Sequence, residues 1–163
     1  IYLKDILEDE KTTEKYLVNR KDVKFWDKNQ TSQLKPIQIG QINKGGQGER
    51  IYSVNGHAIT LSANGGGVAG KTGAYFVNGK IRRLSPRECA RVQGYPEWFK
   101  IPVSKSQAYK QFGNSVAVPV VESIFSQILK VLNSEKIAKI KNSEISEEKK
   151  DYSAQTQLIQ VSQ

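Results

Sequence analysis

The sequence predicts an α/β chain in which a small, twisted, mostly antiparallel β lobe is followed by helices that pack onto a larger body. Ile37, Ile39 and Ile42 show strand-like alternation, and residues 37–84 hold two Asn-Gly pairs, a strong signal for β-hairpins. Ser85 to Glu88 form a capping-box pattern with proline at the first helical position. From Pro119 onward, apolar residues cover a broad helical face, which is typical of a buried helix.

Within the β lobe, the elements follow in a definite order. The charged segment 1–33 is expected to hold one or two helical turns, and residues 37–42 alternate as a strand does. Two hairpins are expected, and two glycine-rich loops separate the strands. The hairpins pair 51–54 with 57–61 across Asn55-Gly56, and 74–77 with 80–84 across Asn78-Gly79; the loops are 43–50 and 65–67.

Three helices are expected after the β lobe. The first runs from Ser85 to about Gln93, where Gly94 supplies a left-handed stop. The second begins at Ser104 and stops at Gly113, and the third begins at Pro119. After residue 133 the chain is rich in Lys, Glu and Ser, so a frayed helix followed by disorder is expected.

The composition limits the classes of function. The net charge is +9, and residues 34–133 hold 13 basic and four acidic side chains, so the whole surplus lies in the middle of the chain. Such a block indicates a polyanion site, or else a well-solvated surface. One cysteine and one histidine cannot build a four-ligand zinc site, so no metal is expected. No window approaches a membrane span and no signal peptide opens the chain, so we expect an intracellular, cytoplasmic protein without a membrane partner.

Two loops carry the residues best suited to bind a polyanion. In the loop 43–50, Gln47 and Arg50 could contact base edges, with glycines allowing close approach; the alternative is a surface loop without a partner. Thr60, with Ser62 and Asn64, leads into the triple glycine, and Lys71 and Thr72 follow it. Hydroxyls, amides and lysine suit a phosphate, although a solvated hairpin tip has the same composition.

Cys89 and His57 are the remaining candidates for chemistry. Cys89 lies inside the predicted first helix rather than at its N-terminus, so we expect a buried structural cysteine. His57 follows a turn and has no sequence partner, which favours a surface residue. Methionine is absent, so we expect either a piece of a longer protein or a missing start.

Together these residues resemble the cytosine-5 DNA methyltransferase family. Residues 82–96 resemble its ninth ordered motif, and residues 111–119 resemble its tenth, in the right order. The target-recognition region of the HhaI-type branch, which modifies the inner cytosine of GCGC, is similar to residues 43–53, 58–63, 65–67 and 71–73. The resemblance covers residues 1 to about 132.

The resemblance implies the rest of the fold and the reaction. Such enzymes have a large Rossmann-like domain that binds S-adenosylmethionine and a small recognition lobe, with duplex DNA in the cleft between them. The target cytosine is flipped out of the duplex, a cysteine thiolate adds to carbon 6, and carbon 5 takes the methyl group. A glutamate assists at the ring nitrogen. A role in DNA methylation within a restriction–modification system follows.

Roles for individual residues also follow from the resemblance. Gln47 would fill the gap left by the flipped base, Arg50 would read a guanine, and Thr60 would hold the neighbouring phosphate. The rest of the expected DNA-binding set is Gly46, Gly48, Gly66, Gly67 and Lys71, and the expected cofactor-binding set is Asn114, Ser115 and Val116.

The implied division of the chain has four parts. Residues 1–85 are the small target-recognition domain with a charged lead-in at 1–33, and 86–113 are the motif-nine helix and hinge. Residues 114–133 are motif ten and a helix that returns to the catalytic domain, and 134–163 are a charged, partly disordered tail.

The departures from the family pattern concern catalysis. The Pro-Cys, Glu-Asn-Val and Phe-x-Gly-x-Gly motifs are absent, and Asn64 replaces an aromatic residue. We therefore expect no catalytic residue in this chain, no methyl transfer by the chain alone, and a catalytic N-terminal part in cis or as a second subunit. The alternatives are a stand-alone DNA-binding module and a degenerate remnant with neither activity nor binding.

Overall fold

The computed structural model describes residues 1–26, 34–134 and 136 of the chain. By the contacts between Cα atoms, the chain divides into two compact units, Ile1–Pro119 and Val120–Gln163. The tail predicted to fray and become disordered falls outside the described residues, except at 134 and 136. The four-part division expected from the family stays a prediction.

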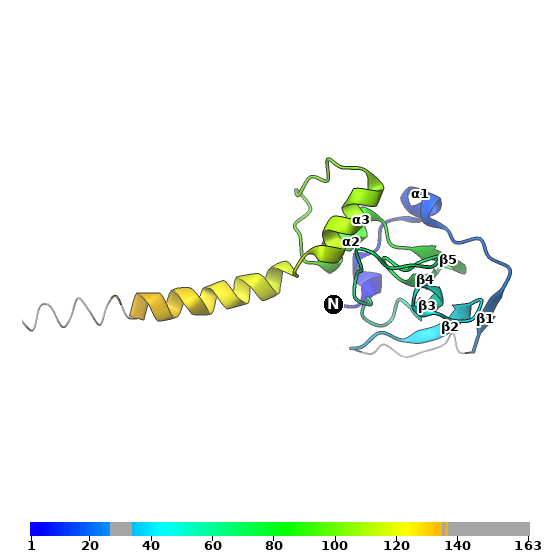
Figure 1. Ribbon diagram of the computed structural model, residues 1–163, viewed down its shortest axis with the longest axis horizontal. Helices are drawn as coiled ribbons and strands as arrows, with labels where there is room; N and C mark the ends of the chain where they lie inside the picture. Colours follow the sequence, from blue (N-terminus) through cyan, green and yellow to red (C-terminus); the bar gives the residue numbers. More distant parts are fainter. Residues whose placement is uncertain (27–33, 135, 137–163) are drawn as a thin grey trace, which may run out of the picture. The chain divides into compact units, whose positions relative to one another are not determined.

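A five-stranded sheet forms the centre of the first unit (Figure 1). The strands are β1 (Val23–Phe25), β2 (Gln38–Ile42), β3 (Arg50–Ser53), β4 (Ala74–Val77) and β5 (Lys80–Arg83). They lie in chain order, and only the β3–β4 pairing is parallel. The predicted mostly antiparallel β lobe is therefore confirmed, although β1 has no counterpart in the prediction.

The second predicted hairpin is confirmed. β4 and β5 pair antiparallel, with Val77 opposite Lys80. Asn78 and Gly79 between them have φ angles of 47° and 83°. A two-residue turn with positive φ at both positions matches the right-handed twist of the flanking strands.

The first predicted hairpin is wrong. Residues 57–61 form no strand, and β3 pairs with β2 and β4 instead. Asn55 and Gly56 do not take the positive φ that a two-residue turn needs. The N-terminal segment uses this stretch, since the amides of Leu3 and Lys4 donate to the carbonyls of Gly56 and Val54, both at 3.0 Å. A tertiary contact has therefore replaced the local pairing.

The N-terminal segment is helical in short pieces, as predicted for its first residues. It contains η1 (Leu3–Ile6), α1 (Glu10–Thr13) and η2 (Glu14–Tyr16). The Asp9 carboxylate accepts a hydrogen bond from the Thr12 amide and caps α1. Leu3, Thr13 and Tyr16 are buried, so the segment packs into the unit.

Two helices follow the sheet, α2 (Pro86–Val92) and α3 (Lys105–Asn114). The predicted capping box at Ser85 is confirmed, and Gly94 follows α2 with a φ of 78°. Ser104 caps α3 as predicted. The predicted stop at Gly113 is wrong, because α3 continues to Asn114 and Gly113 does not have a positive φ.

Two hydrophobic clusters lie on opposite faces of the sheet. Neighbouring residues of β3 and β4 divide between them, as expected from the alternation of side chains along a strand. Ile51 and Ala74 belong to one cluster, whereas Tyr52 and Tyr75 belong to the other, which includes α2 and α3 residues. Cys89 lies in the second cluster with 1% of its surface exposed, and this burial raises the pKa of its thiol. The predicted burial of Cys89 is confirmed.

A buried ion pair joins three parts of this unit. The Arg82 guanidinium of β5 donates to both carboxylate oxygens of Glu88 in α2, at 2.8 and 2.7 Å. The same carboxylate accepts from the amides of Ser85 and Glu8, each at 2.8 Å. Both side chains are almost fully buried. The pair therefore links β5, the start of α2 and the N-terminal segment.

The third helix spans residues 118–134, close to the predicted start at Pro119. Its apolar side chains are exposed; examples are Ile124, Phe125 and Leu129. The stretch Lys105–Ser134 is long and apolar enough, by length and composition alone, to cross a membrane. This corrects the expectation that no window approaches a span; only Glu122 and Lys130 are charged between residues 116 and 132. A core helix of a larger soluble protein has the same properties.

Arg82→Ala should lower the free energy of unfolding by about 3–5 kcal/mol, because it leaves the Glu88 carboxylate buried without its cation. Urea unfolding of the variant and the wild type measures this. Lys80→Ala is the matched control on the same strand: its ion pair with Glu10 is more than half exposed, so solvent screens it. Equal effects of the two substitutions would contradict the assignment.

Candidate functional site

The loop 43–50 is held in shape by Glu49. Its carboxylate accepts a hydrogen bond from the Gly46 amide and one from the Asn43 side-chain amide, both at 3.1 Å. The Asn43 hydrogen bond, followed by that of Gly46, holds the pKa of Glu49 below its usual value. Asn43 itself is in the left-handed region, at φ 50°. Sequence reasoning missed Glu49, although its spacing of three from Gly46 is that of a helix-capping pair.

Gln47 and Arg50 are both exposed on this loop. Gln47 begins the short helix η3 (Gln47–Glu49), and Arg50 begins β3. No hydrogen bond joins either side chain to another described residue, so the amide and the guanidinium remain available to an external partner. The backbone at both residues belongs to regular secondary structure, so the positions from which the two side chains extend are fixed.

The second glycine-rich loop and the residues after it contact the first loop through backbone atoms. The Ala69 amide donates to the Gly48 carbonyl at 2.9 Å. A Cβ added to Gly48 would lie 2.0 Å from the Gly66 carbonyl oxygen, and one added to Gly70 would lie 1.8 Å from that same oxygen. No side chain fits in these spaces. We call Gly48, Gly65, Gly66 and Gly70 the glycine junction.

The junction brings most of the sequence-predicted DNA-binding residues onto two touching loops. Gly46, Gln47 and Gly48 belong to one loop, and Gly66 and Gly67 to the other. The Ser62 amide donates to the Lys71 carbonyl at 2.9 Å, which places Lys71 beside the chain that leaves exposed Thr60. Sequence reasoning treated the two loops separately and did not foresee their contact.

The predicted cofactor corner adjoins the second loop. A Cβ on Gly113 would lie 2.2 Å from the Ala63 backbone nitrogen, so only glycine allows this approach. Asn114 and Val116 just beyond are exposed, and Ser115 is half-buried. Gly113 is therefore a contact point between the corner and residues 62–63, which explains why a glycine stands inside the helix.

Tyr95 and Gln93 hold the predicted cofactor corner in place. The Tyr95 hydroxyl lies 3.2 Å from the Ser115 hydroxyl oxygen, within hydrogen-bonding distance. The Gln93 side-chain amide donates to the Phe112 carbonyl at 3.0 Å, and the Gln93 carbonyl accepts from the Val118 amide at 2.8 Å. Sequence reasoning missed Tyr95 and Gln93, because nothing in their spacing shows that they touch residues 112–118.

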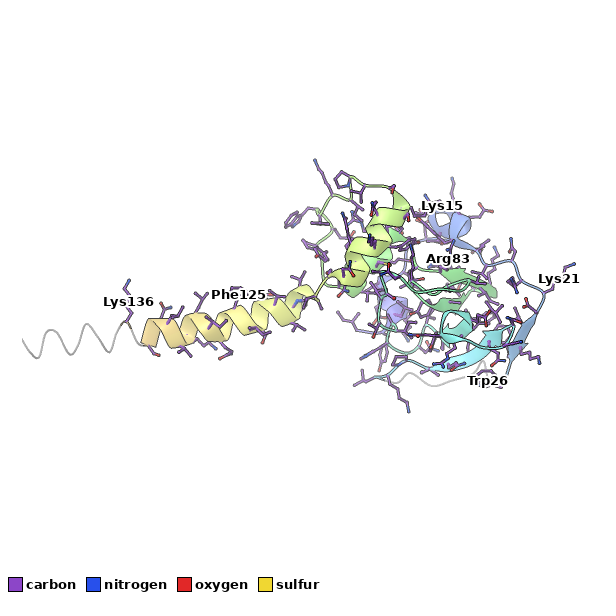
Figure 2. The ribbon with its side chains drawn as sticks, in the orientation of Figure 1. Lys15, Lys21, Trp26, Arg83, Phe125 and Lys136 are labelled. Atoms are coloured by element: carbon purple, nitrogen blue, oxygen red, sulfur yellow. The ribbon has the colours of Figure 1, made fainter. Side chains whose placement is uncertain are left out.

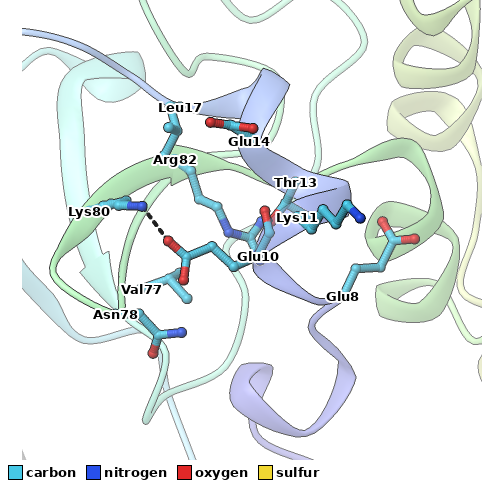
Figure 3. A pocket seen from close by; sticks show the side chains of 10 residues that line it. All are labelled: Glu8, Glu10, Lys11, Thr13, Glu14, Leu17, Val77, Asn78, Lys80 and Arg82. Carbon is cyan, nitrogen blue, oxygen red and sulfur yellow. Dashed lines mark hydrogen bonds and ion pairs between the residues drawn. The ribbon is translucent and has the colours of Figure 1, made fainter.

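The pocket drawn in Figure 3 contains none of the predicted site residues. It measures about 380 Å³ and lies between the N-terminal segment and the β4–β5 hairpin. Glu8, Glu10 and Glu14 line it, and Glu10 pairs there with Lys80. Lys11, Lys80 and Arg82 line it as well, so the three carboxylates offset three cations and no surplus of positive charge favours a phosphate there.

The described residues contain no group of three His, Cys, Asp or Glu side chains that could hold a metal ion. His57 is half-buried rather than on the surface, and its Nε2 atom is buried without a partner among those residues. The prediction of a surface histidine is therefore wrong, because the N-terminal segment covers this stretch, with Leu3 bonded to Gly56.

Gly70→Ala should disrupt the glycine junction, because its methyl group would meet the Gly66 carbonyl. We expect the Ala69 amide to exchange with deuterium faster by roughly tenfold, the equivalent of one lost hydrogen bond. Gly66→Ala is the control, since its methyl group would meet nothing within 4 Å. Unchanged exchange of Ala69 in Gly70→Ala would show that the loops do not depend on this contact.

Comparisons with known proteins agree with this geometry. The family model for C-5 cytosine-specific DNA methylase matches residues 2–130. Type II methyltransferase M.HhaI of Haemophilus parahaemolyticus is 50% identical over 133 residues, which are 81% of this chain and 41% of that protein. Type II methyltransferase M.HpaII of Haemophilus parainfluenzae is 54% identical over 54 residues, 33% of this chain and 15% of that protein.

Solved structures share the fold. The Dnmt2 methyltransferase of S. pombe superposes with a TM-score of 0.58 at 22% identity, covering 82% of this chain and 41% of that one. The Entamoeba histolytica methyltransferase EhMeth gives the same TM-score at 16% identity, with 81% and 41% covered. The chain therefore spans well under half of these relatives, and the match over residues 2–130 places it in the C-5 cytosine-specific DNA methylase family.

Proposed function

We propose that this chain is the DNA-recognition and C-terminal part of a DNA (cytosine-5-)-methyltransferase. The enzyme transfers a methyl group from S-adenosylmethionine to carbon 5 of a flipped cytosine in GCGC. The observation that carries this proposal is the glycine junction, which joins two loops into one surface that presents Gln47 and Arg50. The 50% identity to M.HhaI over 133 residues supports it.

The roles proposed for the loop residues follow from their chemistry. Gln47 carries a donor and an acceptor on an exposed amide, which suits the guanine left without a partner when cytosine flips out. Arg50 has two parallel donors for the O6 and N7 atoms of a guanine. Thr60 and Lys71 suit backbone phosphates, which fix the position of a duplex without reading its sequence.

The corner at Asn114, Ser115 and Val116 is proposed to bind the methionine end of S-adenosylmethionine. The residues fit this group: Asn114 is exposed and carries a side-chain amide, and the chain leaves the helix just beyond it, at 115–117. The cofactor, when bound, supplies the methyl group. Tyr95 orients the Ser115 hydroxyl, and Gly113 holds the corner against the recognition loop.

The proposal requires a catalytic N-terminal part. The family's reaction uses a cysteine thiolate, whereas the single cysteine of this chain is buried and burial raises the pKa of its thiol. The chain alone is therefore proposed to be inactive. The exposed apolar side chains of the helix 118–134 suit a surface that packs on that part.

Methyl transfer from labelled S-adenosylmethionine tests the proposal directly. The chain alone and the chain with its catalytic N-terminal part are each assayed on a GCGC duplex and a scrambled duplex. Transfer only by the mixture, and only to GCGC, is expected. Transfer to other sequences would support the methyltransferase activity but contradict GCGC as the target. Binding of DNA by the chain alone, without transfer in any mixture, would indicate a stand-alone DNA-binding module.

Arg50→Ala should weaken binding of the reconstituted enzyme to the GCGC duplex by about 1–3 kcal/mol, the usual worth of a bidentate base contact. Binding to the scrambled duplex should change much less. Fluorescence anisotropy with both duplexes at one salt concentration measures the difference. An equal loss on both would identify Arg50 as a phosphate contact.

A further inference from the structure

Arg83 stands out because its guanidinium has no anionic partner among the residues that the structure describes. The two arginines at the end of β5 point to opposite faces of the sheet, as neighbouring strand residues do. Arg82 meets the Glu88 carboxylate with two hydrogen bonds. Arg83 makes no side-chain hydrogen bond or ion pair with any other described residue, and its Nε atom is buried. Figure 2 labels Arg83 within the sheet unit.

The surroundings of Arg83 form a small pocket. It measures about 90 Å³ and is bounded by the second glycine-rich loop and α3. Its lining residues are Gly65, Gly67, Val68, Ala69, Gly70, Lys71, Thr72, Arg83 and Tyr109. Arg83 and Lys71 are both cations, and no acidic side chain lines the pocket. The Tyr109 hydroxyl already donates its proton to the Leu84 carbonyl at 2.7 Å.

This arrangement needs an anion from outside the described residues. A partly buried cation that loses water without gaining a hydrogen-bonding partner costs free energy, so such groups are normally paired. A second cation at the same pocket increases that cost through repulsion. An anionic ligand bound between Arg83 and Lys71 in the functional protein would pair with both cations and remove this cost.

We propose that Arg83 and Lys71 form a subsite for a backbone phosphate of the duplex, beside the recognition loops. This rests on the proposed function, in which Lys71 already contacts a phosphate, and adds Arg83 as a new contact beside it. A phosphate is favoured because Gly65 and Gly67 belong to the loop that faces DNA and have no side chains to keep a sugar–phosphate backbone away. Arginine and lysine are the side chains that contact phosphates most.

The proposal predicts a particular kind of defect. A phosphate contact adds affinity without reading sequence, so Arg83→Gln should weaken binding to every duplex alike. Neutralising one contact should reduce the slope of log K against log salt by about 0.9 and weaken binding on the order of fivefold at physiological salt. Arg83→Lys keeps the charge and should retain most of the slope.

The experiment uses the reconstituted enzyme, made of this chain and its catalytic N-terminal part. Dissociation constants for a GCGC duplex and a scrambled duplex are measured at several salt concentrations for wild type, Arg83→Gln and Arg83→Lys. Lys80→Gln is the matched control, because it removes the same charge from the same strand but faces Glu10 in another pocket. Its slope should equal that of wild type. Thermal unfolding of each variant checks that it is folded.

A second measurement locates the phosphate. Single phosphates of the duplex are replaced by uncharged methylphosphonates, one position at a time. One position should weaken the wild type but cause no further loss in Arg83→Gln, because each change removes the same interaction.

Each remaining outcome is decisive. An unchanged slope in Arg83→Gln, with wild type that methylates normally, would overturn the subsite and leave the proposed function intact. Failure of a folded Arg83→Gln to assemble with the catalytic part would assign Arg83 to a carboxylate of that part and overturn the phosphate. A wild type that neither binds nor methylates DNA would overturn both proposals.

Discussion

The buried pair of Arg82 and Glu88 is the interaction on which the rest of this unit depends. One carboxylate receives two hydrogen bonds from the last part of the sheet, one from the start of α2 and one from the N-terminal segment. Because a buried charge tolerates few arrangements, these three elements are held at fixed positions. The capping box at Ser85 therefore does more than begin a helix: its Glu88 sets the direction in which α2 leaves the sheet.

Backbone contact is the second constraint, and it acts where side chains would be too large. The glycine junction joins the two loops that present Gln47 and Lys71, and Gly113 brings the corner at Ser115 against Ala63. Glycines in such loops are often explained by flexibility. Here they allow close packing, so the loops gain order from one another rather than freedom.

Local signals in the sequence predicted the elements that depend on local chemistry. The Asn78-Gly79 turn and the caps at Ser85 and Ser104 were correct, because each depends on residues within a few positions. The Asn55-Gly56 hairpin failed, because the N-terminal segment bonds to that stretch from more than 50 residues away. Gln47 and Arg50 are exposed, and their DNA contacts stay a prediction. Glu49, Tyr95 and the glycine junction act through contacts that spacing does not reveal.

The glycine junction also limits how the two loops could change during evolution or design. Neither loop can be exchanged alone, because a new loop would have to reproduce the spaces at Gly48 and Gly70 that its partner fills. The natural unit of exchange is a cassette from the end of β2 to the start of β4, which carries both loops and β3 together. A recombination boundary inside that cassette would separate the two glycine-rich loops, whose contacting surfaces are complementary.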